Sequence, residues 1–162
     1  PGETRLLVPS PRDVPSYDHK PEMSAREVTE LFCRELEAGG YAFAVVNFAN
    51  PDMVGHTGVV PAVVQAVETV DECLSSVVET VDNLGGVCLV TADHGNAEQM
   101  FEADGTSPHT AHTTNPVPLV VTASGIALRE GGELKDLAPT TLDFLGLDRP
   151  VEMTGETLAR TA

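Results

Sequence analysis

The stretch that decides the fold is residues 41–56, YAFAVVNFANPDMVGH. Residues 41–49 are almost all apolar and include β-branched and aromatic side chains, a composition typical of a strand buried on both faces of a parallel sheet. An Asn-Pro pair ends this run, and the loop that follows carries Asp52 and His56. The stretch therefore predicts a buried strand with a carboxylate and an imidazole beyond its carboxyl end.

A second apolar run ends in the same way. Residues 87–91, VCLVT, predict another buried strand, and Asp93 and His94 follow shortly after it. A further imidazole, His112, lies a short way downstream. Carboxylate oxygens suit Mn²⁺ or Mg²⁺, and imidazole suits Zn²⁺ and its neighbours. With the earlier Asp-His pair these side chains make five candidate ligands, more than one tetrahedral structural zinc site requires, which indicates a two-metal site of the kind that handles phosphate esters.

Helices separate these strands. Apolar residues at helical spacing, with start and stop signals, predict three helices, which run from Ser24 to the glycine pair at 39–40, from Pro61 to the pair at 85–86, and from Asp136 through Leu145. Ser24 and Glu27 match a capping box, and a third strand is expected over residues 117–122. This order indicates an α/β domain, layered α/β/α, with a mostly parallel sheet. In such sheets ligands gather at the carboxyl ends of the strands, where both Asp-His pairs lie.

The chain is strongly acidic, with 9 Lys and Arg against 25 Asp and Glu and a formal net charge of −16. We therefore expect no nucleic-acid or membrane partner, because too little positive charge is present to neutralise phosphates. An acidic chain that binds a phosphorylated anion would need metal ions to reverse the local field. No apolar stretch is long enough to span a bilayer. The odd number of widely spaced cysteines indicates thiols of a cytoplasmic protein rather than a disulfide framework.

Each candidate ligand also has a purely structural interpretation. The spacing of Asp52 and His56 is common by chance, since an Asp often forms a turn and a His often lies on the surface. Asp93 and His94 are the stronger pair, because burying both groups at a core boundary without partners would cost several kcal/mol, although Asp93 could instead act as a cap. Of His109 and His112, one could bind a metal while the other is simply exposed.

Three longer segments resemble signatures of the cofactor-independent phosphoglycerate mutases, which belong to the alkaline-phosphatase-like superfamily. They are residues 45–58, VVNFANPDMVGHTG, residues 91–100, TADHGNAEQM, and residues 111–118, AHTTNPVP. The flanks resemble the family as well, at PSP (9–11), PEMSA (21–25), LAPT (137–140) and EMTG (152–155). The likeness runs essentially from end to end of the chain.

The resemblance implies roles for individual residues. It implies that Asp52, His56 and His112 bind one divalent ion and that Asp93 and His94 bind a second. The ions in the family are usually Mn²⁺, and Mg²⁺, Co²⁺ and Zn²⁺ also suit these ligands. Arg12 stands where the family usually has a lysine that contacts the transferring phosphoryl group. We therefore expect Arg12 to contact phosphate, with the different reach and geometry of a guanidinium.

The resemblance also implies an activity. It predicts that residues 1–162 are the C-terminal portion of the metal-binding, phosphatase-like domain, with the serine nucleophile and an inserted substrate-binding domain outside this chain. The implied glycolytic reaction interconverts 3-phosphoglycerate and 2-phosphoglycerate through a phosphoserine. We expect the isolated chain to be inactive. We also expect it either to self-associate through an exposed sheet edge or to have a locally rearranged sheet. Two alternatives are another metal-dependent phosphomutase or phosphohydrolase of the superfamily, and a non-catalytic metal-binding module.

Overall fold

The computed structural model describes residues 2–161, which form two compact units that interleave along the sequence. The first unit comprises the chain up to Leu84 together with His94–Pro116. The second comprises Gly85–Asp93 together with the chain from Val117 onward. The chain therefore passes between the units three times, and neither unit is one continuous segment.

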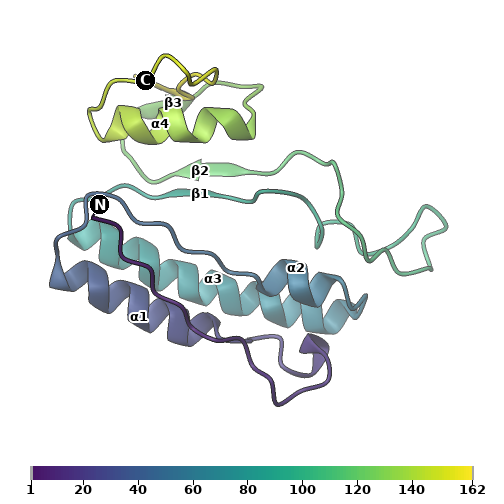
Figure 1. Cartoon of the computed structure of the whole chain (residues 1–162). Helices are drawn as coiled ribbons and strands as arrows, with labels where there is room; N and C mark the ends of the chain where they lie inside the picture. Colours follow the sequence, from purple (N-terminus) through teal and green to yellow (C-terminus); the bar gives the residue numbers. More distant parts are fainter. Residues whose placement is uncertain (1, 162) are drawn as a thin grey trace. The chain divides into compact units, whose positions relative to one another are not determined.

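Helices dominate the first unit. A short 3₁₀ helix, η1 (Tyr17–His19), precedes α1 (Ala25–Ala38), α2 (Asn50–Gly55) and α3 (Val60–Asn83), and α1 and α3 pack side by side (Figure 1). The predicted first and second helices are confirmed, and α3 begins with Pro61 in its first turn, where the missing N–H of proline costs nothing. No helix in the part of the chain that the structure describes is long and apolar enough to cross a membrane.

The predicted capping box at the start of α1 is wrong. Ser24 occupies the N-cap position, but its side chain makes no capping hydrogen bond. Its hydroxyl donates instead to the carbonyl oxygen of Pro9 over 2.8 Å. Ser24 thus fastens the N-terminal segment to the start of the helix rather than closing the helix end.

The core of the first unit lies where α2 packs against the start of α3. Val54 is completely buried there. Its neighbours in this cluster are Met23, Ala62, Val63 and Ala66, with Tyr17, Ala97 and Met100 packed around them. Burying these apolar groups stabilises α2, which at six residues is too short to be stable alone.

The strand predicted over residues 41–49 does not form among the described residues. This segment joins no sheet among the described residues, and most of its side chains are exposed, including Phe43 at 57% and Val45 at 77%. A strand needs a hydrogen-bonded neighbour, and the strands of the second unit pair among themselves. The segment is apolar, but no partner strand for it lies in the described part of the chain.

The second unit contains two small sheets. Strand β1 (Leu89–Thr91) pairs with β2 (Leu119–Val121), and β3 (Ile126–Leu128) pairs with β4 (Ala159–Thr161), both antiparallel. The strands expected near residues 87–91 and 117–122 are present, but the described residues contain no mostly parallel sheet, since both of their strand pairings are antiparallel. Parallel neighbours require a crossover connection, usually a helix, and the chain between β1 and β2 contains none. The structure therefore confirms a chain of helices and strands but not the expected sheet.

Asp136 organises the rest of the second unit. It precedes α4 (Leu137–Phe144), as predicted, and follows the 3₁₀ helix η2 (Leu134–Asp136). Its buried carboxylate accepts hydrogen bonds from the backbone N–H groups of Glu133 and Glu156 and from the guanidinium of Arg129. These donors hold the pKa of Asp136 below its ordinary value. Asp136 therefore joins three separate segments instead of capping α4 with its side chain.

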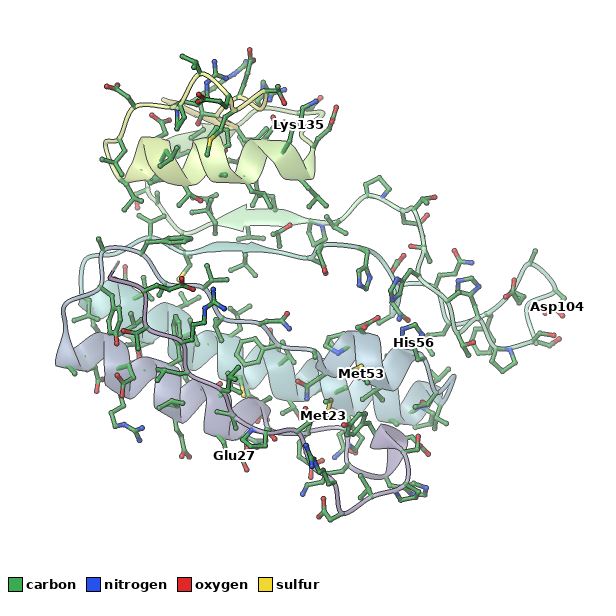
Figure 2. The ribbon with its side chains drawn as sticks, viewed as in Figure 1. Met23, Glu27, Met53, His56, Asp104 and Lys135 are labelled. Atoms are coloured by element: carbon green, nitrogen blue, oxygen red, sulfur yellow. The ribbon has the colours of Figure 1, made fainter. Side chains whose placement is uncertain are left out.

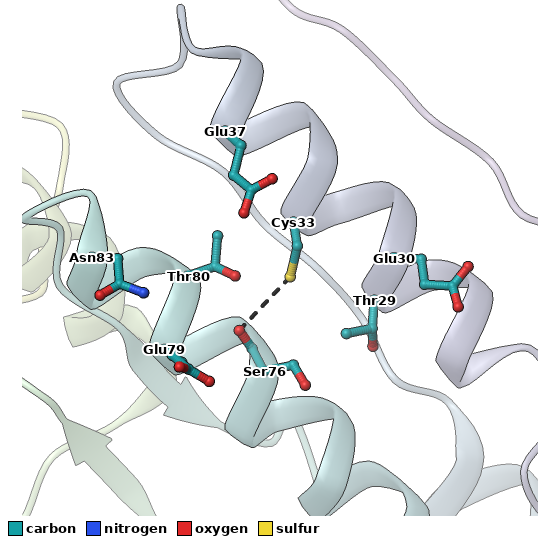
Figure 3. Close-up of a pocket in the computed structure, with 8 residues that line it drawn as sticks. All are labelled: Thr29, Glu30, Cys33, Glu37, Ser76, Glu79, Thr80 and Asn83. Carbon is teal, nitrogen blue, oxygen red and sulfur yellow. Dashed lines mark hydrogen bonds between the residues drawn. The ribbon is translucent and has the colours of Figure 1, made fainter.

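A hollow lies between α1 and α3 in the first unit (Figure 3). Its lining includes Glu30, Glu37 and Glu79, and the Cys33 thiol donates to the Ser76 carbonyl oxygen over 3.8 Å. The hollow is acidic and open, so it resembles a solvated helix–helix seam rather than a binding site.

Candidate metal centre

The short helix α2 presents the first two candidate ligands. Asp52 lies in its first turn. His56 directly follows its last residue (Figure 2). The sequence predicted a loop over these residues, whereas the structure has a helix. Residues four apart lie on the same face of a helix. Val54, between them, points to the opposite side and into the core. The buried valine thus holds both ligands on the exposed face.

Three ligand atoms converge at this face. Oδ1 of Asp52 lies 3.2 Å from Nε2 of His56 and 3.0 Å from Nε2 of His112. The two Nε2 atoms are 3.1 Å apart. Donors bound about 2.1 Å from one ion in tetrahedral or octahedral geometry lie about 3.0–3.4 Å from one another. Asp52, His56 and His112 therefore have the spacing of ligands around a single divalent ion.

The hydrogen bonds around His56 show why a cation fits here. Its Nδ1 lies 2.7 Å from the carbonyl oxygen of Thr110, which can only accept, so Nδ1 carries the proton. In the neutral ring Nε2 then presents a lone pair toward the Asp52 carboxylate. A cation between these two atoms would be attracted by both of them. An imidazole held by a backbone carbonyl through its other nitrogen is the usual arrangement around metal ions in proteins.

His94 lies beside this cluster. Its ring stacks on that of His112, and its Nε2 is 4.0 Å from Oδ1 of Asp52. The neighbouring Asp93 is exposed and belongs to the second unit. The first three predicted ligands are thus brought together with His94 next to them, while the role of Asp93 as a ligand stays a prediction.

His109 has a different role from His112. Its Nδ1 lies 2.9 Å from a carboxylate oxygen of Glu102, across the base of a loop closed by the bridge between Phe101 and Pro108. Its Nε2 is buried and has no hydrogen-bond partner among the described residues. Of the two alternatives that the sequence left open, the geometry places His112 in the candidate metal centre.

Comparison with known families agrees with this chemistry. Residues 1–149 match the model of a family described as the metalloenzyme superfamily. The chain belongs to the metalloenzyme superfamily. This membership and the Asp-His-His cluster both support binding of a divalent metal.

Several relatives of this chain carry one name, 2,3-bisphosphoglycerate-independent phosphoglycerate mutase. Those of Desulforudis audaxviator, Syntrophotalea carbinolica and Picosynechococcus are 58%, 54% and 52% identical to this chain over 97–99% of its length. The chain spans only 31–32% of the length of these relatives. A solved structure of Leishmania mexicana phosphoglycerate mutase, at low cobalt concentration, matches with a TM-score of 0.86 and 33% identity, covering 96% of this chain and 31% of that one.

The structure adds two residues to the site that the sequence did not predict as functional. They are Asn96 and Glu98, and both lie in the segment TADHGNAEQM, residues 91–100. The side chain of Asn96 donates to Asp52, and Glu98 accepts from Asn115 and from the backbone N–H of Asn96. Glu98 also accepts from the Thr113 hydroxyl, and mainly this bond lowers its pKa from 4.5 to about 2. The sequence could have indicated these two residues, because Asn96 and Glu98 are polar and follow the candidate ligand His94 by two and four positions.

Arg12 is exposed and makes no hydrogen bond or ion pair with another described residue of this metalloenzyme chain. Its guanidinium is therefore available to an anion. The predicted phosphate contact of Arg12 stays a prediction.

Proposed function

We propose that this chain supplies the metal-binding part of a 2,3-bisphosphoglycerate-independent phosphoglycerate mutase, which interconverts 3-phosphoglycerate and 2-phosphoglycerate. The observation that carries the proposal is the convergence of Asp52, His56 and His112 within 3.0–3.2 Å. It occurs in a chain that is 52–58% identical, over nearly its whole length, to proteins of that name.

The proposed enzyme holds two divalent ions, which we assign as Mn²⁺, with Mg²⁺, Co²⁺ or Zn²⁺ as alternatives. Asp52, His56 and His112 hold one ion, and Asp93 and His94 contribute to the other. Such ions lower the pKa of a bound hydroxyl and offset negative charge on phosphoryl oxygens. In a chain with a net charge of −16, that positive charge is what allows an anionic substrate to approach.

This chain's own side chains position these groups. The Thr110 carbonyl fixes the tautomer of His56, so that Nε2 faces Asp52. Arg12 contacts the phosphoryl group. The serine that forms the phosphoserine, the remaining ligands of the second ion and the substrate-binding domain come from the part of the enzyme outside residues 1–162. The isolated chain therefore has no mutase activity.

The proposal extends to the sheet and the compartment. In the whole enzyme, residues 41–49 form a strand of a mostly parallel sheet in an α/β/α domain. In the isolated chain, the exposed side chains of Phe43 and Val45 promote self-association. We place the enzyme in the cytoplasm, where thiols such as those of Cys33 and Cys73 stay reduced.

The decisive experiment is a calorimetric titration of Mn²⁺ into this chain and into its His112→Ala variant. We expect about one ion per chain at the Asp52 site and loss of that binding in the variant. His109→Ala is the matched control, because it removes an imidazole three residues away that lies outside the cluster. Equal binding by the chain and the His112 variant would contradict the ligand assignment.

A second experiment tests the activity. A substrate panel on the full-length protein, with phosphoglycerates beside phosphopentoses and simple phosphate esters, separates the mutase from another phosphomutase or a phosphohydrolase of the superfamily. Turnover of phosphoglycerate by the isolated 162-residue chain would contradict the proposal that the nucleophile lies elsewhere.

A further inference from the structure

We infer that the turn from Gly95 to Glu98 assembles the metal centre, with Asn96 and Glu98 as positioning residues that act through Asp52 and His112. The inference rests on the proposed metal binding by Asp52, His56 and His112. Neither Asn96 nor Glu98 belongs to that ligand cluster. Each instead makes hydrogen bonds to a segment that carries a ligand.

Asn96 controls the orientation of the Asp52 carboxylate. Its Nδ2 donates to Oδ1 of Asp52 over 2.8 Å and to the Asp52 backbone oxygen over 3.3 Å. Oδ1 is the same atom that faces both imidazoles. A carboxylate oxygen can accept from Asn96 and still present a lone pair to an ion. The amide therefore fixes rotation of the carboxylate without competing for the ligand atom.

The hydrogen bonds that Nδ2 of Asn96 donates determine the orientation of its side-chain amide. The residue is buried, at 4% exposure, and its Oδ1 has no hydrogen-bond partner among the described residues. A buried polar atom without a partner is uncommon and calls for an explanation. Here the explanation is that the two bonds of Nδ2 to Asp52 fix the amide in this orientation.

Gly55 makes room for this amide. A Cβ at position 55 would collide with the Asn96 side chain, whose Cγ would lie only 2.9 Å away. Only a glycine at the end of α2 lets Asn96 lie directly against the helix that carries Asp52. The close approach therefore depends both on the glycine at position 55 and on the side chain of Asn96.

Glu98 connects the same turn to the segment that carries His112. One carboxylate oxygen accepts from the hydroxyl of Thr113 and, over 2.9 Å, from Nδ2 of Asn115. The other accepts from the backbone N–H of Asn96 over 2.6 Å. The amide of Thr113 also donates to the carbonyl oxygen of Gly95 over 2.9 Å. A single carboxylate thus links the turn to the residues that follow His112.

Gly95 permits this second contact. A Cβ there would collide with the Thr113 hydroxyl and with the Glu98 carboxylate. Two glycines, Gly55 at the end of α2 and Gly95 at the start of the turn, therefore each lie where another segment approaches. Through these contacts one short turn sets the positions of ligands that come from two distant parts of the sequence.

The first test measures metal affinity. We expect Asn96→Ala and Glu98→Gln each to weaken Mn²⁺ binding about 10- to 100-fold, the usual effect of removing a group that orients a ligand. Gln99→Ala is the matched control for Asn96. It removes a side-chain amide directly after the turn, and this amide makes no hydrogen bond to a ligand segment among the described residues. Glu102→Gln is the matched control for Glu98, because it removes one negative charge four residues further along the chain, from a carboxylate that bonds His109 instead of the His112 segment.

A second readout separates positioning from general destabilisation. The visible absorption of bound Co²⁺ reports its coordination geometry. Asn96→Ala should shift the band positions, whereas a smaller folded fraction would lower only their amplitude. Unchanged bands together with Mn²⁺ affinity within twofold of the unaltered chain would overturn the role of Asn96.

The third readout does not need a metal. In the metal-free chain, Glu98→Gln should accelerate exchange of the Thr113 amide proton at least tenfold, while Glu102→Gln leaves it unchanged. If the unaltered chain binds no Mn²⁺, the proposed metal site fails in this chain, but the amide exchange still decides whether Glu98 holds the His112 segment. Equal exchange in both variants would overturn that part of the inference.

Discussion

His94 and His112 stack face to face, with their ring centroids 3.7 Å apart and an angle of 20° between the ring planes. The two residues come from different segments, which the bond from the Thr113 amide to Gly95 holds together. The stack limits rotation of the His112 ring. His94 therefore affects the first metal position even though its own Nε2 lies 4.0 Å from Asp52.

Two replacements of His94 distinguish the contribution of its aromatic ring from that of its nitrogen atoms. His94→Phe keeps the stack, so Mn²⁺ affinity at the first site should stay close to that of the unaltered chain. His94→Ala removes the stack and should weaken binding about two- to tenfold, since an aromatic pair contributes about 0.5–1.5 kcal/mol. Calorimetric titration of both variants checks this. Equal losses in the two would mean that a nitrogen of His94, and not its ring, supports the first site.

Asn50 should be essential for the placement of α2. It is 2% exposed, and its Nδ2 donates to the carbonyl oxygens of Pro21 and Glu22, each over 2.8 Å. Asn50→Ala leaves both acceptors without this donor and should lower the free energy of unfolding by about 1–3 kcal/mol. Asn47→Ala, at an exposed position, is the control. Urea unfolding measures both, and equal midpoints would contradict the anchoring role.

The sequence predicted the helices well because their signals are local. Pro61 lies in the first turn of α3, within one residue of the expected start, and Gly39, with a φ of 83°, follows the last residue of α1 in a conformation that suits glycine. The sheet was predicted poorly because pairing is not local. Nothing within residues 41–49 states which strand lies beside them, and nothing in residues 87–91 shows that their partner runs antiparallel.

The same difference between local and non-local signals separates the site residues that the sequence predicted from those that it did not. Asp52, His56 and His112 were found because their chemistry is visible in the side chains themselves. Asn96 and Glu98 were missed because their importance lies in what they touch, and Asn and Glu near a turn usually face solvent. The helical placement of Asp52 was also missed, because the packing of Val54 stabilises α2 and an Asn-Pro pair ordinarily indicates a turn.

Glu98 should make the stability of the metal-free chain depend on acid pH. Its hydrogen bonds lower its pKa from 4.5 to about 2, so the folded state favours the charged carboxylate. The resulting stabilisation is complete above about pH 4.5 and is lost as the pH falls from there toward 2. Urea unfolding across this range should show the advantage over Glu98→Gln shrinking with falling pH. A difference that stays constant down to pH 2 would contradict this explanation.

Thr140 should contribute more to stability than its neighbour Thr141. The buried Thr140 hydroxyl donates to the Asp136 carbonyl oxygen and accepts from the amide of Leu158, whereas Thr141 only donates, to Leu137. Thr140→Val leaves a buried N–H without an acceptor and should cost about 1–3 kcal/mol, with a smaller effect for Thr141→Val. Chemical unfolding and exchange of the Leu158 amide measure the difference. Similar losses of stability in the two variants would indicate that a change in helix propensity, and not the hydrogen bond to Leu158, causes the effect.

The exposed apolar segment should cause self-association. Sedimentation velocity of the isolated chain at increasing concentration should show oligomers, and Phe43→Thr with Val45→Thr should reduce them. The control is Leu147→Thr with Val151→Thr, which also removes two exposed apolar side chains, at 57% and 94% exposure. Oligomers that persist unchanged in the first double variant would place the contact elsewhere.

The interleaving of the two units constrains the order in which this chain can fold during translation. Strand β1 emerges from the ribosome well before β2, and at about 5–20 residues per second the wait lasts seconds. Residues 94–116, which the first unit needs, are made within that interval. The nascent chain must therefore finish its metal-ligand segments while the edge of β1 is still unpaired. A slow codon or a bound chaperone in this short window would affect the second unit more than the first.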